Sequence, residues 1–95
     1  MAGYLVATVH ITDMASFGEY LKGIAGLSER FGGEVLVRGQ ATAILEGSAP
    51  EGVRVIVSRY PDGAAARAYL DSPEYQAAKQ HRVGAAEVNM ILIED

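Results

Sequence analysis

The chain has 95 residues, a formal net charge of −4 and no cysteine, and 49% of its residues are hydrophobic. These totals predict one folded domain spanning residues 1–95. No cluster of Lys and Arg is present, so neither nucleic acid nor an anionic membrane surface is expected as a partner. The absence of cysteine excludes disulfides and thiolate chemistry, and a cytoplasmic location is the expectation.

Hydrophobic periodicity predicts the order strand, helix, strand, strand, helix pair, strand. The expected strands cover 4–11, 34–47, 53–60 and 88–94, and the expected helices cover about 13–31, 64–70 and 72–82. The run before residue 13 is too short for a membrane span and lacks the basic start of a signal peptide, so a strand is expected there. Gly39 predicts a bend or bulge in the second strand, near residues 38–40.

Short polar residues indicate where the helices begin. Asp13 or Ser16 can cap the first helix, and Asp62 can cap the second. Ser72 is the expected cap of the third helix, because Pro73 follows it at the first helical position.

The order β-α-β-β-α-β is that of the ferredoxin-like fold, an α+β unit whose four-stranded antiparallel sheet carries its helices on one face. Both faces of the expected strands are apolar; in the first strand, Leu5 and Val9 point one way and Tyr4 and Val6 the other. The helices can cover only one face. We therefore expect the other face to pack on the same face of a second copy, forming a homodimer.

Several short motifs along the chain together resemble one known family. They are Asp13 followed by Tyr20, Gly32-Gly33, Arg38-Gly39, Glu46-Gly47, Tyr60-Pro61, and Ser72-Pro73-Glu74-Tyr75 followed by Arg82. In this order, from about Tyr4 to Glu94, the chain resembles domain-of-unknown-function family 1330. One departure is Tyr60, where the family often has Phe.

The resemblance implies a dimeric α+β barrel, in which two ferredoxin-like subunits join their sheets. The wider superfamily includes cofactor-free monooxygenases, haem-degrading and haem-binding enzymes, and muconolactone-type isomerases, which typically use a pocket between sheet and helices. The resemblance implies no particular reaction, because function has to be argued from the site.

The last helix carries two candidate ligand-binding residues, Tyr75 and Arg82, which share one helical face. Arg82 could receive a carboxylate or another anion at the mouth of a pocket. In the alternative, its stem packs over Tyr75 while its guanidinium pairs with an acid such as Glu74, Glu87 or a carboxylate of a partner chain.

Arg38 and Glu46 are further candidates for ligand binding, since each precedes a glycine in the motifs above. The alternative for both is a structural salt bridge that spans the bend or the dimer.

His10 and Tyr20 are the candidate catalytic residues. His10 ends a strand and could act as a general base near neutral pH, as could His81, the only other histidine. The alternative for each residue is a bystander or core role. The two histidines lie on separate elements with no carboxylate at ligand spacing, so no metal site is expected. No cofactor is expected either, although haem held by one histidine stays open.

Two kinds of function are consistent with the sequence. The first is a dimer that binds a small aromatic or anionic metabolite between sheet and helices. As an enzyme it would carry out cofactor-independent oxygenation or isomerisation, with His10 or a tyrosine as base and Arg38 or Arg82 as anion anchor. The second is a non-catalytic structural or interaction dimer. A histidine facing a cavity would favour the first, and a cavity filled by aromatic residues of the helices would favour the second.

Overall fold

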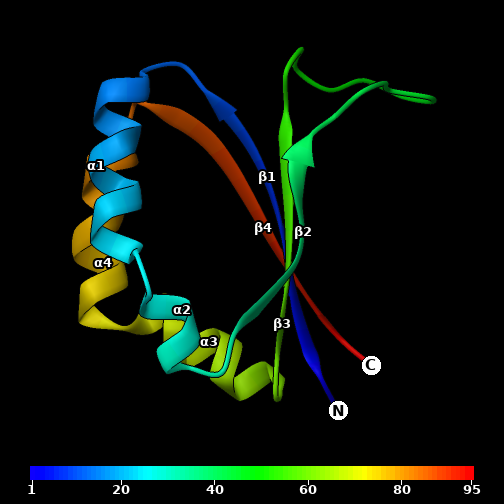
Figure 1. Cartoon of the computed structure of the whole chain (residues 1–95). Coiled ribbons are helices and arrows are strands. Elements are labelled where there is room, and N and C mark those ends of the chain that lie inside the picture. Colours follow the sequence, from blue (N-terminus) through cyan, green and yellow to red (C-terminus); the bar gives the residue numbers. More distant parts are fainter.

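One antiparallel sheet with helices on one side makes up the chain in the computed structural model, which describes residues 1–95 (Figure 1). The strands are β1 (Gly3–Ile11), β2 (Glu34–Gln40), β3 (Arg54–Tyr60) and β4 (Ala86–Glu94). The helices are α1 (Met14–Ile24), α2 (Leu27–Arg30), α3 (Gly63–Asp71) and α4 (Pro73–Lys79), followed by the 3₁₀ turn η1 (Gln80–Arg82). The strand order is β2-β3-β1-β4, with every neighbouring pair antiparallel. The predicted ferredoxin-like fold is confirmed. None of the helices has the length and apolar character needed to cross a membrane.

The helices begin where short polar residues satisfy their free N–H groups. Asp62 and Ser72 each accept a hydrogen bond from the backbone N–H three residues ahead, at 2.8 and 3.2 Å. At the first helix the cap is Asp13, which accepts from the backbone N–H of Ser16 at 3.2 Å. The Ser16 hydroxyl itself donates to Asp13, so Ser16 is not the cap.

The prediction of one long first helix is wrong in one respect, because the structure breaks it into two helices. Helix α1 ends at Ile24 and α2 begins at Leu27. Gly26 lies between them with φ 73°, a left-handed conformation that is unfavourable for residues with a side chain and favourable for glycine. The break changes the direction of the chain (Figure 1). It buries Leu27, which is 3% exposed, and brings Ser28 and Glu29 to a cavity wall.

The second strand also differs from its prediction. It ends at Gln40, opposite Arg54, and residues 41–52, here called the arm, form neither helix nor strand. The β-prone residues of the arm have no neighbouring strand to pair with, because β3 begins only at Arg54. The irregularity in β2 lies between Val35 and Val37, with Leu36 as the extra residue, and not at residues 38–40.

The core fills the space between the helices and one face of the sheet. Its buried members are Leu5, Val9, Phe17, Tyr20, Leu27, Tyr60, Ala66, Tyr69, Tyr75 and Ala78. Four of them are tyrosines whose rings pack against one another, with centroids 5.0 Å apart for Tyr69 and Tyr75. So many buried hydroxyls require polar partners, which gives the core chemistry as well as packing.

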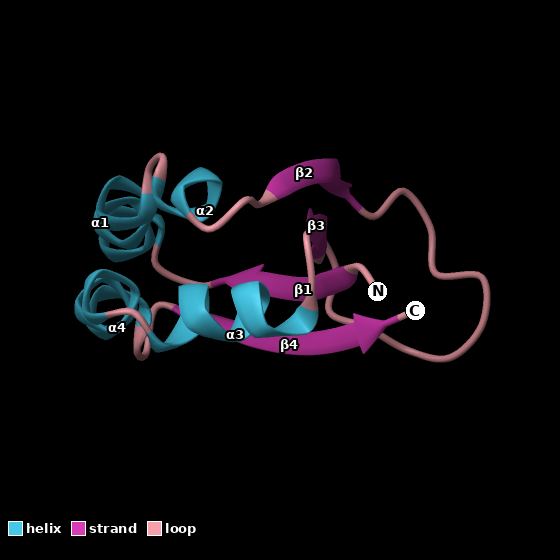
Figure 2. Cartoon of the chain, turned by 90° about the horizontal axis from the view of Figure 1, so that it is seen from below, coloured by secondary structure: helices cyan, strands magenta, loops and turns pink.

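The face of the sheet without helices, here called the open face, is apolar at its centre. Val37, Val57, Val6 and Ile91 are paired in one continuous row across all four strands. Val37 and Ile91 are 58% and 56% exposed. Both faces of the sheet are therefore apolar, as the alternation predicted. The arm extends on the side of the open face, away from the helices, and its Leu45 is 90% exposed (Figures 1 and 2).

Candidate functional site

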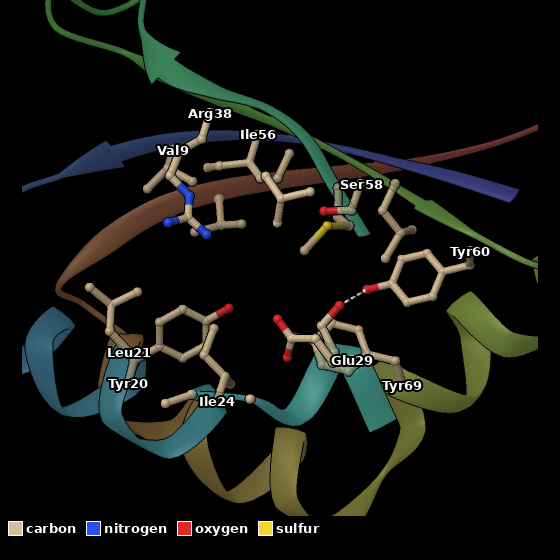
Figure 3. Close-up of a pocket in the computed structure, with 18 residues that line it drawn as sticks. Val9, Tyr20, Leu21, Ile24, Glu29, Arg38, Ile56, Ser58, Tyr60 and Tyr69 are labelled. Carbon is tan, nitrogen blue, oxygen red and sulfur yellow. Dashed lines mark hydrogen bonds between the residues drawn. The ribbon is translucent and has the colours of Figure 1, made fainter. Parts of the chain in front are cut away.

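A cavity of about 250 Å³ lies between the helix-covered face of the sheet and helices α1 and α2 (Figure 3). Its apolar lining comes from the sheet and from α1, α3 and the α1–α2 link; these residues are Leu5, Ala7, Val9, Tyr20, Leu21, Ile24, Ala25, Val35, Ile56, Tyr60, Tyr69, Val88 and Met90. An apolar cavity of this size is large enough for an aromatic ring with small substituents.

Arg38 reaches this cavity because of the bulge in β2. Val35 faces the cavity, so regular alternation would turn Val37 toward the cavity and Arg38 away from it. The extra residue, Leu36, reverses this alternation. Val37 then lies on the open face, and Arg38 is paired with Ile56 on the cavity face. The guanidinium of Arg38 points into the hollow (Figure 3), and no carboxylate lies within ion-pair distance of it.

The opposite wall carries the polar residues that follow the helix break. The Glu29 carboxylate points toward the hollow (Figure 3) without forming an ion pair. The Ser28 hydroxyl and the Tyr60 hydroxyl are joined by a hydrogen bond of 2.9 Å. Burial raises the pKa of Tyr60 and of Tyr69, and at Tyr60 the bond with Ser28 opposes that rise. Both tyrosines therefore keep their protons at neutral pH.

Tyr20, which forms part of the cavity wall, belongs to a group of three polar side chains, here called the tyrosine–arginine cluster. Its other two members, Tyr75 and Arg82, lie behind that wall. Arg82 Nη1 donates to the Tyr75 hydroxyl at 2.6 Å and to the Tyr20 hydroxyl at 3.0 Å. The Tyr20 hydroxyl lies 3.5 Å from that of Tyr75. The guanidinium carbon is 4.9 Å from the Tyr20 ring centre and 5.6 Å from that of Tyr75, which are cation–π distances.

Arg82 has no acidic partner. No carboxylate lies within ion-pair distance of it, and Glu74 pairs with Arg30 at 3.4 Å instead. The structure thus differs from the alternative in which the guanidinium pairs with Glu74 or Glu87. Arg82 is half-buried and directed at phenol oxygens, which are weaker acceptors than a carboxylate.

The other predicted site residues lie apart from the cavity. Tyr75 is 2% exposed and does not line the cavity, but it packs against Tyr20 and Tyr69, which do. His10 is paired with Glu87 on the open face, His81 is exposed on η1, and Glu46 is exposed in the arm. No three His, Asp or Glu side chains gather in a way that could hold a metal ion.

Sequence reasoning missed Ser28, Glu29 and Tyr60 as wall residues. A signal for the first two was available in Gly26, because a helix broken at that glycine would point the next polar residues in a new direction. For Tyr60 the signal was its hydroxyl, at a position where the resembled family often has Phe, but this departure was not interpreted as a wall residue.

The chain matches, over residues 2–95, the family described as domain of unknown function DUF1330, and it belongs to that family. The family predicted from the motifs is confirmed. A comparison with curated proteins found no match to the chain.

Several solved structures share the fold. RPA0582, a protein of unknown function from Rhodopseudomonas palustris, is 24% identical with a TM-score of 0.80, over 99% of this chain and 82% of that one. A dimeric ferredoxin-like protein of unknown function from Jannaschia sp. CCS1 is 17% identical with a TM-score of 0.72, over the whole of both chains. SnoaB, a cofactor-independent oxygenase from Streptomyces nogalater, is 15% identical with a TM-score of 0.67, over 99% and 92%. At these identities the likeness is one of fold alone.

Proposed function

We propose that the chain binds a small anionic molecule with an apolar or aromatic body in the cavity between sheet and helices. The observation that carries this proposal is Arg38, a cation without an acidic partner that points into an otherwise largely apolar cavity. Arg38 is exposed in the single chain, and its guanidinium, at the edge of apolar walls, can form a charge-assisted hydrogen bond to an anion. The apolar walls would contact the body of the ligand, and Arg38 would hold its charged group.

Benzoate and its neutral analogue benzamide test this proposal, because they differ mainly in charge. We expect benzoate to bind more tightly than benzamide when both are titrated by NMR or calorimetry. Replacing Arg38 with Gln should weaken benzoate binding about 10- to 100-fold, since a hydrogen bond to a charged group contributes about 1.5–3 kcal/mol.

Arg67→Gln is the matched control, because Arg67 is exposed on α3 and does not line the cavity. This variant should bind benzoate as the unchanged chain does. Equal affinity for benzoate and benzamide, or an Arg38→Gln variant with undiminished benzoate binding, would contradict the proposal.

We also propose that two copies pair through their open faces, giving the dimeric α+β barrel. The row Val37, Val57, Val6 and Ile91 supports this pairing, because a continuous apolar row is costly to leave in water. The arm supports it as well, since it extends on the side where the second copy would be (Figure 1) and carries the exposed Leu45. The Jannaschia protein of the same fold is itself described as dimeric.

A second candidate function is catalysis by cofactor-independent oxygenation or isomerisation. The observation that favours it is Tyr20, a cavity-lining hydroxyl in direct contact with the guanidinium of Arg82. No histidine lines the cavity, so in this candidate the proton-transferring group would be Tyr20 in place of His10. The reaction of SnoaB belongs to that protein and supports this candidate only through the shared fold.

A purely structural dimer is the weaker alternative. The cavity is not filled by the aromatic residues of the helices, because Phe17 and Tyr75 pack in the core without lining it. The roles predicted for His10 and Glu46 and the cytoplasmic location stay predictions.

A further inference from the structure

The hydrogen bonds of the tyrosine–arginine cluster leave both of its hydroxyl protons, those of Tyr20 and Tyr75, without a good acceptor. The two N–H groups of Arg82 Nη1 are directed at the two hydroxyl oxygens, at 2.6 and 3.0 Å. Each tyrosine oxygen is therefore already an acceptor. The remaining contact, from Tyr20 to Tyr75, is 3.5 Å long, which is at the outer limit for a hydrogen bond between hydroxyls. The Tyr20 hydroxyl thus has a well-paired oxygen and a poorly paired proton.

Tyr20 is the member of the cluster that lines the cavity, whereas Tyr75 and Arg82 lie behind it. Figure 3 shows the Tyr20 hydroxyl directed toward the hollow. A molecule in the cavity would offer the acceptor that the chain itself does not supply at short distance. The Tyr20 ring is 7% exposed and in contact with Phe17, so its position is fixed by packing.

Arg82 makes this hydroxyl a stronger hydrogen-bond donor. A positive charge on the oxygen of a phenol draws electron density from the O–H bond, and the guanidinium has no carboxylate to neutralise it. Burial, together with Tyr75, raises the pKa of Tyr20 despite the opposing effect of Arg82, so the proton stays on Tyr20 at neutral pH. A neutral donor that is supported by a cation and held in place by packing is suited to stabilising negative charge on a bound oxygen.

We propose that Tyr20 donates a hydrogen bond to a negatively charged oxygen of the bound molecule, of the phenolate, enolate or carboxylate type. Arg82 acts through Tyr20 and Tyr75 as a positioning residue. The inference rests on the proposed function, since it requires a ligand in the cavity. It adds that the ligand carries an oxygen able to hold negative charge, and it assigns the recognition of that oxygen to Tyr20.

The probe for this inference is 4-nitrophenol, whose phenol and phenolate forms absorb at different wavelengths. At a fixed pH, we expect the bound probe to contain a larger phenolate fraction than the free probe. Tyr20→Phe, which keeps the ring and removes the donor, should lower the phenolate-to-phenol ratio of the bound probe about tenfold, equivalent to one pKa unit. Because Arg38 also favours phenolate and the Glu29 carboxylate on the opposite wall disfavours it, the difference between the unchanged chain and Tyr20→Phe carries the test.

Arg82 is tested in the same assay with two substitutions. Arg82→Met should lower the bound phenolate fraction as Tyr20→Phe does, and Arg82→Lys, which keeps the charge, should restore part of it. If Arg82→Met fails to fold, as judged by circular dichroism, Arg82→Lys and Tyr20→Phe still decide the question. Tyr4→Phe and Arg67→Met are the matched controls, because both residues lie outside the cavity wall, and the bound spectrum should not change.

The outcomes separate this inference from the function on which it rests. If 4-nitrophenol binds with the same phenolate fraction in the unchanged chain and in Tyr20→Phe, the cluster only joins α1 to α4, and the inference is overturned while the proposed function stands. If the unchanged chain binds neither benzoate nor 4-nitrophenol, both are overturned. A lower phenolate fraction in Tyr20→Phe and Arg82→Met with unchanged controls supports the inference.

Discussion

The variant Ile91→Asp is expected to be a monomer at concentrations where the unchanged chain forms the proposed dimer. Ile91 lies at the end of the apolar row on the open face and is 56% exposed in the single chain, so its substitution leaves the core intact. In a two-fold symmetric dimer the substitution places a carboxylate in each half of the interface. Burying an unpaired carboxylate costs several kcal/mol, so the dissociation constant should rise at least about 1,000-fold.

Sedimentation velocity across a range of concentrations measures this effect directly. The matched control is Val83→Asp, which introduces the same charge at an apolar residue that is 71% exposed and follows η1, away from the open face. This control should remain dimeric. A dimeric Ile91→Asp variant would show that the copies do not pair through the open face, and an unchanged chain that is monomeric would remove the dimer altogether.

The sheet and its helices were predictable because local sequence patterns and the final contacts agree. Asp62 and Ser72 cap their helices, as the sequence predicted, and each does so through a hydrogen bond to a residue only three positions ahead. The apolar alternation in β1 matches the burial of Leu5 and Val9. Such features depend on neighbours along the chain, so periodicity and capping rules can predict them.

The errors in β2 arose where pairing with another strand decides the structure. The residues after Gln40 have strand propensity, yet β3 offers no partner beyond Arg54. The position of the bulge depends on which register gives the better burial on both faces, and Gly39 did not determine it. This one displacement matters for function, because the extra residue Leu36 is what turns Arg38 into the cavity.

The candidate site was predictable as a set of residue types but not as a set of contacts. Tyr20 and Arg82 were both candidates, but their contact spans 62 positions in the sequence and depends on how α1 packs beside η1. The sequence suggested an acid as the partner of Arg82, because charge pairing is the common outcome for arginine. The structure instead supplies two phenol oxygens, an arrangement that no local pattern specifies.

The buried tyrosines should make the fold unstable in alkali. Burial raises the pKa of Tyr20, Tyr60 and Tyr69 above the ordinary value near 10. Below about pH 10 these groups keep their protons in both folded and unfolded chains, and the stability they contribute is complete. Above it the unfolded chain loses protons that the folded chain retains, so the free energy of unfolding falls as pH rises toward the folded-state values. Each tyrosine contributes a slope of up to about 1.4 kcal/mol per pH unit, or about 4 kcal/mol per unit for the three.

Urea unfolding followed by circular dichroism between about pH 8 and pH 12 measures that slope, since the expected loss over the last two units is comparable to the whole stability of a small domain. Tyr69→Phe provides the matched variant. It removes one of the three groups while keeping the ring, so its stability should fall less steeply above about pH 10, by roughly 1.4 kcal/mol per unit. In parallel, the part of the tyrosinate absorbance that comes from Tyr20, Tyr60 and Tyr69 should rise only as the fold is lost. If all five tyrosines ionise near their ordinary value while the circular dichroism stays native, the hydroxyls are accessible to water. In that case Tyr20 could not serve as the neutral, protected donor that the cavity requires.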